Sequence, residues 1–268
     1  MKNHWDDQAA AVAIQRWGER CGSDFALRLY TADLIGQDPD LVLHGGGNVS
    51  LKRPYRTILG DEVEAIHVKG SGWDLAGIEP EGMPALDLGR LRRLRSLASL
   101  DDHMMTNELR THLFDASAPT PSLETLLHAF LPHRFIDHSH ADAVLALTNQ
   151  PDGERLIREA LGEQVAILPY VTPGFELAKA VAELFESKPA VEGIVLIHHG
   201  LVTFGDEART SYERHVRIVD TCEKYIARHG AGRRLTASYQ PPASPAELAA
   251  LVAPIMRGLI AWPTGPAT

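Results

Sequence analysis

The sequence is poor in cysteine: only Cys21 and Cys222 occur among its 268 residues. This excludes a disulfide framework and a zinc site built from thiolates. No apolar run approaches the roughly 18 residues that a membrane-spanning helix needs. The first residues, Met1–Asp7, lack the apolar segment of a signal peptide. We therefore expect a cytoplasmic protein without a membrane partner.

Positive charge is also scarce. The chain has 26 Lys and Arg residues against 35 Asp and Glu residues, which gives a formal net charge of −9. Such a balance excludes nucleic acid as the main partner. An anionic substrate would need local compensation from backbone N–H groups, a metal ion or individual Lys and Arg residues. The hydrophobic content of 44% is ordinary for a folded globular protein.

One stretch carries most of the candidate chemistry, and its first half predicts a helix. Apolar residues recur three and four positions apart from Leu123 to Phe130. Pro121 suits the first position of a helix, and Pro132 ends it. Glu124 would then lie in the first turn. There it is either a catalytic base or an acidic residue favoured by the helix dipole.

The second half of this stretch predicts a strand that carries two histidines. Phe135–His140 is followed by Ala143–Leu147, which continues in a strand-like pattern. Because side chains alternate along a strand, His138 and His140 share one face. Two adjacent imidazoles can occupy two positions of a tetrahedral zinc site. A His-x-His pair also arises by coincidence, so the interpretation requires a third ligand.

Two glycine-rich turns offer backbone N–H groups to an anion. His44–Lys52 is predicted to follow a short strand at Leu41–Leu43, and Gly70–Asp74 is predicted to follow a strand at Ala65–Lys69. Glycines let the backbone turn tightly and approach a ligand. A flexible hairpin turn would explain either glycine run alone. Two such turns in succession, each with a hydroxyl residue, predict a shared anion pocket.

The predicted elements indicate an α/β protein. Helices and strands follow one another in an order that favours helices covering a mostly antiparallel sheet. Composition changes near residue 230, where Gly, Arg and Pro become frequent, and a last amphipathic segment covers about 245–260. We expect one domain at residues 1–232, and a linker with a helical tail at residues 233–268.

Six motifs stand in one order along the chain: Gly46–Ser50, Gly70–Gly72, Pro121–Glu124, His138–His140, Pro169–Thr172 and His199–Gly200. The set resembles the class II aldolase/adducin family, which includes zinc-dependent fuculose- and rhamnulose-phosphate aldolases. The resemblance spans roughly residues 23–228 and implies a three-layer α/β/α fold. The sequences around the two glycine motifs are most similar to the aldolase module of bifunctional rhamnulose-1-phosphate aldolase/alcohol dehydrogenase proteins. This similarity therefore implies a missing short-chain dehydrogenase domain after the tail.

The resemblance implies a metal site and a catalytic carboxylate. His138, His140 and His199 match the family's ligands to zinc, and another divalent ion is also compatible with them. Three neutral imidazoles leave zinc an open coordination position, which is the catalytic pattern. There the ion would stabilise the enediolate left by carbon–carbon cleavage. Glu124 matches the family's catalytic glutamate, and His128 lies one turn later, where it would orient Glu124.

The resemblance also implies an anion site, with two departures. The positions that match the family's substrate- and phosphate-binding residues are Gly46, Asn48, Ser50, Ser71, Gly72 and Ser122. Gly45 stands where the sugar-phosphate aldolases have a threonine, and Leu123 where they often have a second serine. Two hydroxyl donors are therefore missing. A phosphate, a carboxylate or a smaller anion all stay open as the group that binds.

Tyr170 matches a tyrosine that, in the aldolases, reaches a neighbouring subunit and protonates the departing aldehyde's oxygen. This implies a homotetramer, although a core tyrosine beside Pro169 would explain the residue equally well. The function implied is a zinc-dependent aldehyde-lyase that cleaves a ketose phosphate or a related hydroxy-carbonyl anion. The alternatives are a dehydratase, an epimerase (these tend to carry aspartate at the position of Glu124) or an adducin-like scaffold. A scaffold would have lost the metal, and the retained histidines speak against it.

Overall fold

The computed structural model describes residues 1–230 and 244–260. Within these residues a seven-stranded sheet has the order β3-β2-β1-β4-β7-β6-β5. Its strands are β1 (Asn48–Arg56), β2 (Glu62–Val68), β3 (Ala85–Asp87), β4 (Phe135–Ser139), β5 (Val165–Leu168), β6 (Gly193–Leu196) and β7 (Gly200–Gly205). Only the β5–β6 pair is parallel among these strands, so the predicted mostly antiparallel sheet is confirmed.

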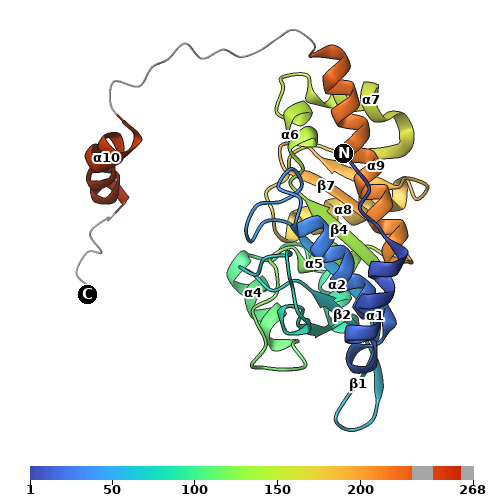
Figure 1. The fold of residues 1–268 in the computed structure, drawn as a ribbon. Coiled ribbons are helices and arrows are strands. Elements are labelled where there is room, and N and C mark those ends of the chain that lie inside the picture. Colours follow the sequence, from blue (N-terminus) through green and yellow to red (C-terminus); the bar gives the residue numbers. More distant parts are fainter. Residues whose placement is uncertain (231–243, 261–268) are drawn as a thin grey trace. The chain divides into compact units, whose positions relative to one another are not determined.

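Helices cover both faces of the sheet (Figure 1). One face carries α1 (Asp7–Cys21), α2 (Ser23–Gly36), α6 (Asp142–Thr148), α7 (Gly153–Leu161) and α9 (Ala208–His229). The other face carries α3 (Leu88–Leu94), α4 (Asp102–Thr111), α5 (Thr125–Phe130) and α8 (Phe175–Ser187). Two short 3₁₀ turns, Pro80–Gly82 and Gly162–Gln164, join these elements.

Strand alternation divides the core into two hydrophobic clusters, one on each side of the sheet. In β4, Phe135 packs with α2 and α9, whereas its neighbour Ile136 packs with α5 and α8. The same alternation places His138 on the α5 face and Asp137 and Ser139 on the α9 face. The sheet with its two helix layers is the three-layer α/β/α arrangement that was expected.

A buried polar layer holds the α9 face of β4. Asp137 forms an ion pair with Arg28 and accepts a hydrogen bond from Ser211, and all three side chains are fully buried. On the same face, His215 of α9 lies 2.6 Å from Ser139 Oγ. Removing one partner of such a pair leaves an uncompensated charge, which typically costs about 3–5 kcal/mol. These contacts therefore fix the strand that presents His138.

Burial of His215 predicts a loss of stability in acid. It lowers the pKa of His215 from 6.5 to about 4, so the folded chain binds this proton only at lower pH than the unfolded chain. The stabilisation is complete above pH 6.5 and is lost as the pH falls toward 4, by up to about 1.4 kcal/mol per pH unit. Urea unfolding with a chelator present should show a steeper pH dependence for the wild type than for His215→Gln. Equal slopes would contradict this assignment.

Two of the predicted strands were wrong. Leu41–Leu43 is a turn after α2, in which the N–H groups of Leu41 and Val42 donate to Asp38 O. Both side chains still enter the core, which explains the strand-like apolar run. Ala143–Leu147 lies in helix α6 rather than in a continuation of β4. Its buried residues recur at helical spacing, and so short an apolar run does not distinguish the two structures.

The helix expected from Pro121 begins later. Helix α5 begins at Thr125, and Glu124 is its N-cap residue. Pro121 instead forms a β-bridge with Gly70, and Ser122 N–H donates to Lys69 O at 3.1 Å. The segment before α5 is therefore bound to the second glycine turn. Glu124 stands at the junction of that segment and the helix.

The C-terminal region is a separate unit from residues 1–229. The predicted linker at 233–243 and the end of the tail at 261–268 lie outside the described residues. The predicted helical segment is α10 (Pro245–Ile260). Its exposed large apolar residues are Leu248, Leu251, Val252, Ile255 and Met256. Among the described helices, none is long and apolar enough to cross a membrane.

Candidate metal centre

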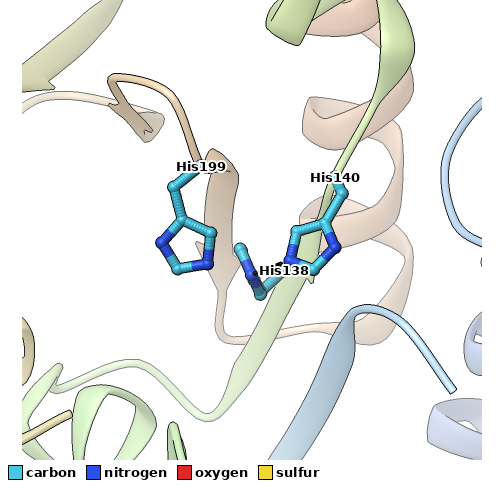
Figure 2. Close-up of side chains that lie close together, drawn as sticks. All are labelled: His138, His140 and His199. Carbon is cyan, nitrogen blue, oxygen red and sulfur yellow. Dashed lines mark hydrogen bonds between the residues drawn. The ribbon is translucent and has the colours of Figure 1, made fainter. Parts of the chain in front are cut away.

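Three histidine rings converge at the end of β4 (Figure 2). His138 belongs to β4, His140 follows directly after it, and His199 comes from the turn between β6 and β7. The Nε2 atoms of His138 and His140 are 3.2 Å apart. One candidate ligand nitrogen from each ring lies within 4.8 Å of the others. The predicted shared face of His138 and His140 thus gains the third imidazole that a catalytic zinc site needs.

The turn between β6 and β7 directs His199 inward. Its N–H donates to Leu196 O at 3.1 Å. A Cβ atom on Gly200 would lie 2.2 Å from Ser139 O, so only glycine lets β7 approach β4 at this point. His198, the residue before His199, has a positive φ of 60°. Its ring is exposed, and Nδ1 lies 3.0 Å from Asn149 Oδ1. Adjacent histidines therefore have different surroundings.

The two histidines at the end of β4, His138 and His140, are held in the neutral form that binds metal. His138 Nδ1 lies 3.1 Å from Leu201 O and donates its proton there, which leaves the Nε2 lone pair directed at the cluster. Burial lowers the pKa of His138 to about 4, and burial likewise lowers the pKa of His140. At neutral pH no proton competes with a metal at these two rings.

Glu124 places a carboxylate beside the histidines. Its Oε2 lies 3.3 Å from His138 Nε2 and its Oε1 lies 3.2 Å from His199 Nε2. Burial alone would raise the pKa of Glu124, but the two imidazoles and a hydrogen bond from Asn48 bring it below the usual value. Glu124 Oε1 is buried and has no hydrogen-bond partner among the described residues. Three imidazoles and an unsatisfied carboxylate oxygen fit a divalent cation.

The two glycine turns lie together beside this cluster. A Cβ atom on Gly45 would lie only 3.5 Å from Gly72 Cα. The cavity between them has a volume of about 280 Å³. Its lining comprises Gly45, Gly46, Gly47, Asn48, Lys69, Ser71, Gly72, Ser122, Leu123, Glu124, His140, Pro173 and His199. The predicted anion pocket therefore shares one cavity with His140 and His199, whereas the fully buried His138 lies outside its lining.

The expected site residues do not all reach this cavity. Of the expected substrate-binding residues, only Ser50 does not line the cavity. Its side chain is fully buried and is hydrogen-bonded to His128. Tyr170 is 55% exposed and is also absent from the lining. Its ring centroid is 6.4 Å from that of His198, which lies outside the histidine cluster.

Lys69 lines the cavity, although sequence reasoning did not single it out. Its Nζ donates to Gly45 O at 2.9 Å and to Trp73 O at 2.6 Å, which joins the two glycine turns. An ammonium group has a third proton to offer. Burial lowers the pKa of Lys69. A lysine at the junction of a strand and a glycine turn was a visible signal, but most lysines in such positions are solvated.

Comparison with known proteins places the chain in a family. Residues 28–226 match the model of the class II aldolase and adducin N-terminal domain. The uncharacterized oxidoreductase YuxG of Bacillus subtilis strain 168 is 35% identical over 226 residues, which are 84% of this chain and 32% of that protein. The chain thus spans about a third of the length of this relative.

Solved structures show the same fold. The N-terminal class II aldolase domain of a conserved protein from Thermoplasma acidophilum is 39% identical, with a TM-score of 0.76 over 84% of this chain and 99% of that one. A sugar-phosphate aldolase from Thermotoga maritima has a TM-score of 0.58 at 15% identity, over 79% and 97% of the two chains. The latter likeness concerns the fold alone. By its sequence and its fold, the chain belongs to the class II aldolase and adducin family.

Proposed function

We propose that the chain is a metal-dependent aldehyde-lyase acting on a ketose phosphate or a related hydroxy-carbonyl anion. The observation that carries this proposal is the buried Glu124 carboxylate within 3.3 Å of the imidazoles of His138 and His199. His138, His140 and His199 would hold zinc or another divalent ion. When bound, that ion would act as a Lewis acid toward the oxygen atoms of the substrate.

Glu124 is the proposed proton-transfer group. In the condensation direction its carboxylate takes a proton from the carbon next to the carbonyl, and in cleavage it returns that proton. The electrons of the broken carbon–carbon bond stay with the carbonyl fragment, and the other fragment leaves as an aldehyde. Asn48 Nδ2 donates to Glu124 Oε2 at 2.7 Å and so holds one carboxylate oxygen in place.

Lys69 is the proposed charge partner of the substrate anion. The sequence lacks two of the hydroxyl donors that the sugar-phosphate aldolases use, because Gly45 and Leu123 replace them. Lys69 adds a cation at the same cavity, beside Ser71 and Ser122. A charged donor binds an anion more strongly than a hydroxyl group does. This exchange supports a substrate that still carries a phosphate or a carboxylate.

Lys69→Met should weaken binding of an anionic substrate. Losing a charge-assisted hydrogen bond predicts that KM rises about tenfold to a hundredfold with little change in kcat. Steady-state kinetics on a phosphorylated substrate and on its dephosphorylated analogue would check this, because only the former should respond. Lys179→Met, at a half-buried position of α8 outside the cavity lining, is the matched control. Equal effects on the two substrates would contradict the assignment.

We further propose that Tyr170 serves the site of a neighbouring subunit in a homotetramer, where it donates a proton to the aldehyde oxygen in condensation and takes the hydroxyl proton in cleavage. Its exposed position, outside the cavity lining of its own chain, supports an action between chains. A Tyr170→Phe chain mixed with a Glu124→Gln chain would test this. Active mixed oligomers would support the shared site, and additive loss without complementation would oppose it.

The reaction itself can be tested by a substrate screen. Dihydroxyacetone phosphate with short aldehydes should give a condensation product in the presence of zinc. Water loss or inversion at a carbon, without condensation, would instead indicate a dehydratase or an epimerase. A folded chain that binds no metal would indicate an adducin-like scaffold.

The name of the Bacillus relative bears on the rest of the protein. Because this chain matches 32% of a protein called an oxidoreductase, we propose that it precedes a dehydrogenase domain in a longer chain. Sequencing the reading frame beyond Thr268 would test this directly.

A further inference from the structure

A buried row of four side chains leads from Ser50 to Glu124. Asn48 and Ser50 are two residues apart in β1 and therefore face α5 together. His128 of α5 is fully buried and contacts both. Its Nε2 lies 2.5 Å from Asn48 Oδ1 and its Nδ1 lies 2.8 Å from Ser50 Oγ. Asn48 Nδ2 completes the row by donating to Glu124 Oε2 at 2.7 Å.

Only one set of proton positions satisfies this row. An ionised Glu124 accepts hydrogen bonds and donates none, so Asn48 must direct its NH₂ group at the carboxylate and its Oδ1 at His128. Oδ1 in turn requires a proton on His128 Nε2. Burial lowers the pKa of His128 to about 3, so the ring is neutral and carries a single N–H. Nδ1 is then an acceptor, and the Ser50 hydroxyl donates to it.

We propose that His128 is a positioning residue for Glu124, because its Nε2–H holds the Asn48 amide in the orientation that donates to the Glu124 carboxylate. The inference rests on the proposed function of Glu124. Without the His128 proton, the amide is free to turn its oxygen toward the carboxylate, where two acceptors would face each other. Glu124 Oε2 would then lose the hydrogen bond that fixes it.

The effect of His128 must pass through Asn48. Neither His128 nor Ser50 lines the cavity, and both are fully buried. Asn48, by contrast, both lines the cavity and contacts the carboxylate. Ser50 was expected to bind substrate, but its hydroxyl instead sets the tautomer of His128. Ser50 therefore has an indirect role, through His128, in place of the expected contact with substrate.

Two substitutions of His128 separate positioning from packing. His128→Leu should lower kcat about tenfold to a hundredfold, with KM within about threefold and the metal content unchanged. His128→Gln places an amide N–H where it can reach Asn48 Oδ1, and it should recover most of the loss. In an Asn48→Ala background, His128→Leu should cost nothing more. Equal losses in both backgrounds, or no recovery with glutamine, would overturn the inference.

A measurement without turnover tests the same point. ¹⁵N NMR of the metal-free protein with labelled histidine should show His128 protonated at Nε2 and unprotonated at Nδ1. A proton on Nδ1 would overturn the inference whatever the activity. The expected tautomer in a protein that forms no aldol product would support the hydrogen-bond order and count against the proposed function alone.

Discussion

Glu124→Gln is expected to lower turnover by about 10²–10⁴-fold, because glutamine cannot accept the proton that the carboxylate transfers. The change keeps the size and the planar shape of the side chain, and Asn48 Nδ2 still finds an oxygen acceptor. The three histidines are untouched, so the metal content should stay at the wild-type level. Steady-state kinetics together with elemental analysis of the same sample would measure both effects.

A matched control distinguishes proton transfer by Glu124 from mere stabilisation of the N-terminus of α5. Glu176 is an exposed acidic residue in the first turn of α8. If Glu124 only favours the N-terminus of α5, both Glu124→Gln and Glu176→Gln should cost less than about 1 kcal/mol of stability and leave turnover intact. If Glu124 transfers the proton, only its own variant loses activity. Full activity in Glu124→Gln would contradict the proposed chemistry.

His199→Ala is expected to weaken metal binding by more than about a hundredfold. The change removes a metal ligand itself, not a residue that only hydrogen-bonds to a ligand. The neighbouring His198→Ala should bind metal like the wild type, since its ring contacts Asn149 outside the cluster. The two variants lose the same chemical group one residue apart. Zinc titration followed by calorimetry would measure the two affinities.

Turnover should follow the metal in this pair. His199→Ala is expected to be inactive at zinc concentrations that saturate the wild type, and His198→Ala is expected to be active. Equal affinities for the two variants would show that His199 is not a ligand. A loss in His198→Ala alone would reassign the site to the other ring.

The strand periodicity around His138 was sufficient to predict two of the three histidines in the metal cluster. Side-chain alternation placed His138 and His140 on one face, and the hydrophobic clusters on either side of β4 agree with this register. His199 was inferred only from the resemblance to the family. Its approach depends on Gly200, whose close contact with Ser139 joins residues about 60 positions apart in the sequence. Local sequence patterns do not predict contacts between residues that are so far apart in the sequence.

The errors have physical causes as well. The apolar run at Ala143–Leu147 is as short as a strand, but the buried residues of α6 recur at helical spacing: Ala143, Val144, Leu147 and Thr148. Pro121 looked like a helix start, although its backbone forms a β-bridge with Gly70 that no local rule predicts. The partners of His128 lie 78 and 80 residues away in sequence. The row that ends at Glu124 could therefore be seen only after β1 and α5 were in place.

The most direct test of the account is the metal content of the purified wild-type chain after incubation with zinc and removal of excess ion. We expect about one divalent ion per chain, bound by His138, His140 and His199. Chelation should remove the ion together with all aldol activity, and zinc should restore both. A folded chain that retains no divalent ion under these conditions would contradict the central claim.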